Sequence, residues 1–206
     1  MADILIDNET IPSTPAASKS LLFVDSTTKK FAQMDDAGTV RGLLGRNFTV
    51  ISSGAGFAAD TYVAGSGILL PSFNLQVGAL FRWTMIGSKT AAGVATPTFI
   101  FRLGTGVIGD TALLTLTGVA QTAAVDNGMF IFELFIKTAG VSSAVYGQMA
   151  LIHSAANAVG FGSTELDALS GTVDLSTSAG KTLGISINGG ASAAWTLTTV
   201  HGEMIS

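Results

Sequence analysis

The fold class follows from one stretch, Met129-Phe130-Ile131-Phe132-Glu133-Leu134-Phe135-Ile136-Lys137. Successive residues of a β-strand point to opposite faces of the sheet, so the pattern predicts a strand whose even-numbered residues, 130–136, face inward. The residues between them, including Ile131 and Phe135, form a second face that is also mostly apolar. A monomer seldom leaves such a face in water. We therefore expect Ile131 and Phe135 to be covered, either by other strands of the same chain or at an oligomer interface with an identical subunit.

Runs of the same kind lie on both sides of this stretch. They are rich in β-branched and aromatic residues, and turn signals such as Gly104-Thr105-Gly106 and Asn188-Gly189-Gly190 separate them. No segment has a helical period. Eight such runs in one domain predict an antiparallel β-sandwich of the jelly-roll type, and other all-β topologies stay open. The runs are residues 77–86, 98–103, 112–117, 129–138, 144–153, 172–175, 182–187 and 194–205.

The first part of the chain is built differently, because residues 1–46 hold a large share of the charged side chains. Short apolar runs at 21–24, 30–34 and 39–44 are separated by turn-forming residues, which predicts a small β-meander. Three short strands rarely fold alone, so we expect this segment to be ordered by packing on a partner or on copies of itself. Three parts are therefore expected: the meander at 1–46, a connecting region with a strand or two at 47–70, and the sandwich at 71–206.

The composition excludes several classes of protein. With 206 residues, the chain is too short for two large enzyme domains. A net charge of −4 argues against nucleic acid as a partner, and the absence of cysteine excludes disulfides and thiolate metal sites. The longest uncharged stretch, 138–164, is interrupted by glycines and polar residues, so no membrane insertion is expected. Residues 1–7 lack the features of a signal peptide, so we do not expect export by the host.

One motif could suggest a nucleotide site. Gly104-Thr105-Gly106-Val107-Ile108-Gly109 has the G-x-G-x-x-G spacing and follows a predicted strand. A dinucleotide loop must lead into a helix whose N-terminal N–H groups meet the pyrophosphate. Here residues 110–117 alternate threonine with apolar residues and predict a strand instead. The motif is therefore interpreted as a turn, and no cofactor is expected.

Catalytic chemistry has little support in the residue pattern. The two histidines, His153 and His201, lie in strand-like runs, and no spacing links either to a nucleophile, so we interpret both as structural. Glu165 and Asp167 could share one face of an extended segment as an acid and base pair for sugar hydrolysis, but a solvated loop is the preferred interpretation. No catalytic residue and no metal ligand is predicted.

A resemblance to a known family lies in the N-terminal meander. Pro15, Lys19-Ser20-Leu21-Leu22-Phe23-Val24-Asp25, Thr28-Lys29-Lys30 and Asp35-Asp36-Ala37-Gly38-Thr39-Val40-Arg41-Gly42-Leu43 resemble a segment that recurs in fibre, spike and decoration proteins of tailed bacteriophages. The Gly-, Thr- and Ala-rich remainder, with a closing strand at 195–200, resembles in style the compact β domain, often a trimeric jelly roll, that such proteins carry outermost.

The resemblance implies a non-enzymatic structural protein on the outer surface of a virion, assembled in the host cytoplasm and acting as a homo-oligomer, with a trimer as the expected state. Its partner would be the major capsid protein or another virion protein. The meander would attach the protein to the particle through apolar contacts and a charged rim. The candidate attachment residues are Leu22, Val24, Asp25, Lys30, Phe31, Asp36 and Arg41.

Two locations on the virion are compatible with this resemblance. A tail fibre needs a shaft, seen as heptads or a long strand repeat, and residues 44–71 contain neither, which favours a capsid decoration or head-fibre protein. The alternative is a short tail-fibre or baseplate adhesin that binds a host-surface glycan. In that case an aromatic side chain would stack on a sugar, the candidates being Tyr62, Trp83, Tyr146 and Trp195. An enzyme that degrades glycans is the outside alternative.

Overall fold

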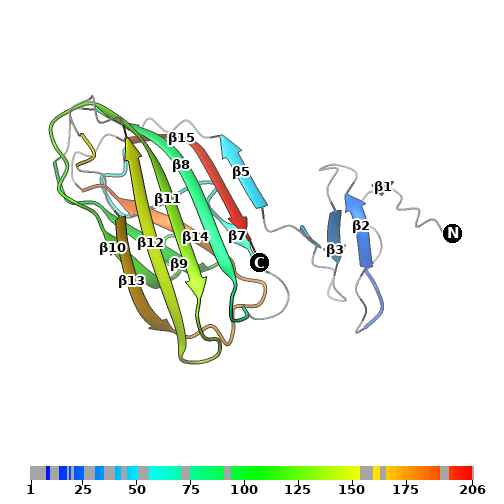
Figure 1. Ribbon diagram of the computed structural model, residues 1–206. Coiled ribbons are helices and arrows are strands. Elements are labelled where there is room, and N and C mark those ends of the chain that lie inside the picture. Colours follow the sequence, from blue (N-terminus) through cyan, green and yellow to red (C-terminus); the bar gives the residue numbers. More distant parts are fainter. Residues whose placement is uncertain are drawn as a thin grey trace. The chain divides into compact units, whose positions relative to one another are not determined.

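The computed structural model, shown in Figure 1, describes residues 8–9, 14–17, 19, 21–25, 31–34, 40–42, 46–50, 56–70, 75–90, 94–153, 160–162, 166–190 and 195–205. Of residues 8–9, 25, 31, 33, 40–42, 46–50 and 166–169 it describes the backbone. The chain divides into two compact units, Met1–Gly45 and Arg46–Ser206. Each unit has its own sheet structure and its own core.

The described residues form strands and no helix, so the chain is all-β, as the sequence predicts. Among these residues there is accordingly no helix with the length and apolar character needed to cross a membrane. The first unit holds β1 (Asn8–Glu9), β2 (Leu21–Asp25), β3 (Phe31–Met34) and β4 (Val40–Gly42). The second unit holds β5 (Arg46–Val50), β6 (Thr61–Tyr62), β7 (Ile68–Leu69), β8 (Leu80–Lys89), β9 (Thr98–Gly104), β10 (Thr111–Thr117), β11 (Asp126–Ile136), β12 (Ser143–His153), β13 (Leu166–Val173), β14 (Thr182–Asn188) and β15 (Trp195–Met204).

The first unit contains the predicted meander. Strands β2, β3 and β4 pair in sequence order, and both pairings are antiparallel. The short β1 adds to β2 in parallel, which the sequence did not indicate because Asn8-Glu9 has no strand pattern. The described core of this unit consists of Phe23, Ala32 and Met34. So few buried side chains supply little of the apolar burial on which a domain's stability rests.

The second unit is a sandwich of two antiparallel sheets, which confirms the predicted architecture. The six-stranded sheet has the order β13-β12-β11-β8-β15-β5. The five-stranded sheet has the order β10-β9-β14-β6, and β7 also pairs with β14. Figure 1 shows the two sheets as separate layers. At one side of the sandwich β10 packs against β13.

Three times the chain leaves the six-stranded sheet and returns to it, first after β5, when it forms β6 and β7 in the opposite sheet before β8. After β8 it leaves the six-stranded sheet, forms β9 and β10 in the opposite sheet, and returns as β11 beside β8. After β13 it crosses again to form β14 beside β9, and returns as β15 on the other side of β8. Strand β8 therefore lies between two strands that are distant from it in the sequence. Its partners, β11 and β15, belong to two separate parts of the chain.

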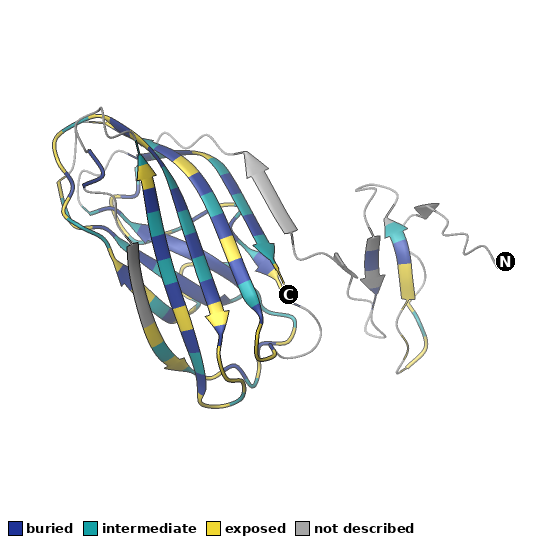
Figure 2. Ribbon diagram, viewed as in Figure 1, coloured by how far each residue is buried: buried dark blue, intermediate teal, exposed yellow. Residues whose placement is uncertain are grey.

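In the six-stranded sheet the buried residues follow the alternation expected of half-buried strands, and Figure 2 shows alternating bands along β8, β11 and β12. In β11 the even-numbered residues 130–136 are buried, as predicted. Aromatic rings dominate the layer: Phe130 stacks on Trp195 with centroids 5.5 Å apart, and Phe99 lies 5.2 Å from Phe132. Ring pairs of this kind add roughly 0.5–1.5 kcal/mol beyond the burial of their area. The two sheets are therefore joined by an aromatic core.

One glycine of β15 is required by close packing in this core. A Cβ at Gly202 would lie 2.8 Å from Cδ1 of Trp83, which occupies the same space on the neighbouring strand β8. The indole of Trp83 is buried and donates its Nε1–H to the carbonyl of Ser66 at 2.7 Å. A hydrogen bond therefore fixes one edge of the Trp83 indole, and the indole fits in this position because Gly202 has no side chain.

All eight predicted runs overlap strands, but three of these strands differ from the predicted bounds by two residues or more. Strand β8 begins at Leu80 because Gly78 has a φ of 92°, which ends the extended backbone before it. Strand β11 begins at Asp126, where the sequence has a turn signal, because Asp126 pairs with Lys89 of β8. Strand β13 lies earlier than predicted, at Leu166–Val173, where it pairs with β12. Long-range pairing overrode the local turn signal at β11 and placed β13 beside β12, whereas the start of β8 is set locally by Gly78.

Residues 46–70, most of which the sequence analysis treats as a connection, contribute three short strands to the second unit. Strand β5 pairs with β15 at the edge of the six-stranded sheet. Strands β6 and β7 both pair with β14, and the segment between them carries the buried Val63 and Ser66. This region therefore supplies an edge to each sheet.

Candidate functional site: the outer face of the six-stranded sheet

The six-stranded sheet turns one side towards the core and the other away from it. The side away from the core carries the alternate residues of four neighbouring strands, and none of these residues is fully buried. We call this surface the outer face. Its residues are Leu80, Arg82, Thr84 and Ile86 of β8, Met129, Ile131, Glu133 and Phe135 of β11, Tyr146, Gln148, Ala150 and Ile152 of β12, and Thr199, His201, Glu203 and Ile205 in and just after β15.

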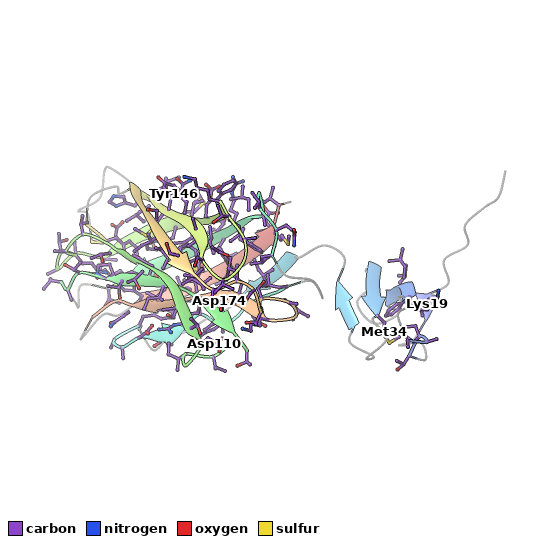
Figure 3. The ribbon with its side chains drawn as sticks, turned by 90° about the horizontal axis from the view of Figure 1, so that it is seen from below. Lys19, Met34, Asp110, Tyr146 and Asp174 are labelled. Atoms are coloured by element: carbon purple, nitrogen blue, oxygen red, sulfur yellow. The ribbon has the colours of Figure 1, made fainter. Side chains whose placement is uncertain are left out.

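The strand register arranges the outer face in rows. One apolar row crosses three strands as Tyr146, Phe135 and Leu80, because Phe135 pairs with both of the others. The side chain of Phe135 is 39% exposed and that of Tyr146 is 43% exposed. Figure 3 shows Tyr146 on the six-stranded side of the sandwich and Asp110 on the opposite side. Ile205, whose N–H donates to the carbonyl of Leu80 at 2.8 Å, extends this row.

A second apolar row lies six residues away along the strands. It consists of Ile152, Met129 and Ile86, with Met129 paired to both neighbours. Ile152 is 50% exposed and Ile86 is 44% exposed. Large apolar side chains that are exposed singly are normal, but contiguous rows of them mark interaction surfaces. The outer face carries two such rows.

A charged row separates the apolar ones. Glu133 pairs in register with Arg82 on one side and Gln148 on the other. The Nε–H of Arg82 donates to Oε1 of Glu133 at 2.7 Å, and Gln148 donates its side-chain amide to the other carboxylate oxygen. This carboxylate is therefore neutralised and hydrogen-bonded within the chain. Because Arg82 is partly exposed, solvent screens the pair and its contribution to stability is small.

The two predicted interface residues both belong to the outer face, but they differ in exposure. Phe135 is exposed in the first apolar row, whereas Ile131 is half-buried between Ala150 and Thr84 in the row beside the charged one. No described strand of the second unit covers this face, since Phe135, Tyr146, Ile86 and Ile152 are exposed there. The sequence left two alternatives for covering Ile131 and Phe135, other strands of the chain or an identical subunit. Other described strands of the second unit do not cover them.

The candidate attachment residues lie in the first unit. Leu22 is 53% exposed, and Val24 is half-buried. The backbone register pairs Val24 with Phe31 and pairs Gln33 with both Leu22 and Arg41, so these positions fall in neighbouring rows of the meander. Asp25 ends β2. Lys30 and Asp36 lie outside the described residues.

The G-x-G-x-x-G motif forms a hairpin turn between β9 and β10, as predicted. Its backbone N–H groups bind the chain's own carboxylate: Asp110 accepts from Thr105 at 2.9 Å, Gly106 at 2.7 Å and Val107 at 3.0 Å. A Cβ at Gly104 would lie 2.3 Å from Oδ1 of Asp110. The loop thus has the geometry of an anion-binding nest, and Asp110 occupies it.

This enclosure changes the titration of Asp110. Burial raises the pKa of Asp110, but the hydrogen bonds from Thr105, Val107 and Gly106 together lower it more, so the pKa lies below its ordinary value. The carboxylate therefore stays charged to lower pH than an exposed aspartate does.

A buried polar cluster occupies one end of the sandwich. Nδ1 of His153 lies 2.9 Å from Oδ2 of Asp126, and the two side chains are 2% and 0% exposed. The same carboxylate accepts the N–H of Phe161 at 3.1 Å. Lys89, which pairs in register with Asp126, donates to the carbonyl of Thr122 at 2.7 Å.

The burial of this cluster favours a structural role for it. An aspartate and a histidine in contact are two parts of a hydrolytic triad, but a substrate must reach the histidine. Burial lowers the pKa of Lys89 while the charge of Asp126 raises it, and the net shift is downward. The sequence did not indicate the cluster, because Asp126 was interpreted as a turn residue and Lys89 lay beyond the end of a predicted strand.

The other predicted sites have mixed outcomes. Trp83 and Trp195 are buried in the core, so the prediction that either could stack on a sugar is wrong, whereas Tyr146 is exposed. Tyr62 is half-buried. His201 lies on the outer face with Nε2 3.9 Å from a carboxylate oxygen of Glu203. Glu165 lies outside the described residues. Asp167 lies in β13, where the structure describes the backbone.

Neither a search for metal-binding groups nor a comparison with known proteins assigns a function to this chain. Within the part of the chain that the structure describes, no group of three or more His, Asp or Glu residues could hold a metal ion. Comparison with known proteins found no matching family, no matching curated protein and no matching solved structure.

Proposed function

We propose that this chain is a non-enzymatic structural protein on the outer surface of a tailed-phage virion, and that it works there as a capsid decoration or head-fibre protein. In this proposal the second unit assembles with copies of itself, and the first unit binds the major capsid protein or another virion protein. The protein is assembled in the host cytoplasm. The phage assignment rests on the resemblance of the N-terminal segment, and the assembly role rests on the outer face.

The observation that carries the proposal is the pair of exposed apolar rows. Phe135, Tyr146, Ile86 and Ile152 are all exposed by more than a third on one side of one sheet. Between them, Glu133 already has its hydrogen-bond partners within the chain. Burying this face would remove apolar surface from water without leaving an unpaired charge, and that combination suits a protein interface. The face is a surface for association.

The first unit supports the attachment role. Its described core contains only Phe23, Ala32 and Met34, while Leu21 and Leu22 are exposed on the strand that carries Phe23. A unit with so small a core gains stability by docking its exposed leucines on a preformed surface. Leu22 and Val24 are the described attachment candidates with such apolar side chains.

The proposal is tested by locating the protein on particles. Virions of a phage that carries this gene would be compared by cryo-EM with virions that lack it, after adding purified protein back. Extra density at regular positions on the capsid is the expected result. Density at the tail tip would instead favour the glycan-binding adhesin, for which Tyr146 is the exposed aromatic candidate. Absence from both places would contradict a virion role.

A matched pair of variants tests the attachment surface. Leu22→Lys places a charge on an exposed leucine of the first unit, and Leu69→Lys places the same charge on an exposed leucine of the second. We expect Leu22→Lys to reduce binding to particles and Leu69→Lys to leave it unchanged. Equal binding by both variants would contradict attachment through the meander.

A further inference from the structure

The charged row of the outer face extends across the centre of the six-stranded sheet. In register, Gln148 of β12 is followed by Glu133 of β11, Arg82 of β8 and Glu203 of β15. Arg46 of β5 is the register partner of Glu203 at the edge. From β11 to β5 the row therefore alternates acidic and basic residues.

This alternation makes the row complementary to itself. Consider a two-fold axis that runs parallel to the strands, between β11 and β8, in the plane above the outer face. Rotation about it lays a second copy face to face on the first and reverses the strand order within each row. Glu133 then lies over the second copy's Arg82, and Gln148 lies over the second copy's Glu203. Each carboxylate meets a donor, which is the charge complementarity that fixes register between partners.

The same axis also matches the apolar rows. Because rotation about an axis along the strands keeps each row at the same level, Phe135 lies over the second copy's Leu80 and Tyr146 lies over its Ile205. In the other apolar row, Met129 lies over Ile86. An isologous interface requires such matching, since every contact between two different residues occurs twice.

We propose that the outer face is the contact between two copies of this chain, related by a two-fold axis along the strands between β11 and β8. This inference rests on the proposed function, because it identifies the partner and the symmetry of the assembly role. A highly basic or highly acidic partner is disfavoured, since Arg82 and Glu133 neutralise each other within the chain. A second copy provides both charges in the matching order.

The symmetry distinguishes this inference from the trimer that the resemblance implies. A two-fold contact produces a dimer of the full-length chain. Light scattering should give a mass of twice 20.9 kDa at micromolar concentration. A mass of three times that value would overturn the two-fold pairing while leaving the proposed homo-oligomer in place. A monomer would overturn both, and would indicate that another virion protein or another part of the chain covers the face.

Charge reversal tests the pairing itself. Arg82→Glu places two carboxylates beside each other in each copy, and Glu133→Arg places two guanidinium groups there. Each variant alone should dimerise at least about tenfold more weakly than the parent protein at low salt, because like charges then face each other across the axis. An equimolar mixture of the two variants should recover dimers that contain one copy of each. The double variant Arg82→Glu/Glu133→Arg should also recover dimers.

Asp174→Arg provides the matched control, because Asp174 is exposed on the loop after β13 and is not part of the charged row. It should dimerise like the parent protein. Thermal unfolding confirms that every variant is folded, which we expect since the Arg82–Glu133 pair is partly exposed. Unchanged dimerisation of both single variants, or a mixture that associates no better than its components, would refute the two-fold pairing.

Discussion

Replacing Asp126 by Ala removes the acceptor at the centre of the buried cluster. The carboxylate of Asp126 accepts hydrogen bonds from the ring of His153 at 2.9 Å and from the N–H of Phe161 at 3.1 Å. Neither donor gains access to water when Asp126 is lost, because His153 is 2% exposed in its side chain and Phe161 is buried. The substitution therefore leaves two buried donors unsatisfied.

The expected loss follows from these two donors. At about 1–3 kcal/mol for each unsatisfied buried group, the free energy of unfolding of the second unit should fall by about 2–6 kcal/mol. A domain has a total stability of only about 5–15 kcal/mol, so the effect is easily measured. The loss of the negative charge opposite Lys89 adds to it in the same direction, because Asp126 raises the pKa of that lysine.

Urea unfolding followed by tryptophan fluorescence measures this loss. Both tryptophans, Trp83 and Trp195, lie in the second unit, so the signal reports on that unit alone. Asp174→Ala is the matched control, because Asp174 also accepts a backbone N–H, from Ser176 at 2.8 Å, but is exposed. Water replaces that acceptor, so the control should lose much less stability. If Asp126→Ala lost no more than Asp174→Ala, the assignment of a stabilising buried network would be wrong.

Three further outcomes are expected from similar measurements. Because the pKa of Asp110 is lowered in the folded state, its carboxylate stabilises the fold above its ordinary pKa, and this contribution is lost as the pH falls through the lowered value. The difference in urea midpoint between the parent protein and Asp110→Asn should therefore disappear at low pH, and a constant difference would contradict this. Gly202→Ala should lower the free energy of unfolding by about 1–3 kcal/mol, because its Cβ would meet Trp83, and a neutral effect would show that the indole can shift. Because the net shift in the pKa of Lys89 is downward, the unfolded chain binds more protons between that value and the ordinary one, so raising the pH through this range should stabilise the parent protein relative to Lys89→Met. Parallel pH profiles for these two proteins would contradict it.

The strand content was predictable because its signal is local. Inward and outward residues alternate along the whole of β11, and most strands after residue 71 carry enough of the same pattern to be located from their own residues. The G-x-G-x-x-G turn could also be interpreted correctly, since the strand pattern of residues 111–117 follows it directly. In the first unit, turn residues between three short runs indicated β2, β3 and β4 for the same reason.

Features that depend on which strands become neighbours were not predictable in this way. The sequence alone does not reveal that β8 lies between β11 and β15, and only this order brings Arg82 beside Glu133 and Lys89 beside Asp126. The burial of Trp195 likewise depends on its packing against Phe130 across long sequence separation.

The sequence by itself therefore determined that this chain is all-β, with a small charged meander before a sandwich and with an apolar face on both sides of the strand at 129–137. Alternation along one strand is sufficient for these conclusions, because the side-chain direction repeats every two residues. Only the tertiary structure decided the rows of the outer face, the enclosure of Asp110 and the buried cluster around Asp126. These features depend on which residues of neighbouring strands pair with one another. The paired residues are far apart in the sequence, and a slip of one residue would turn every side chain of a strand to the opposite face.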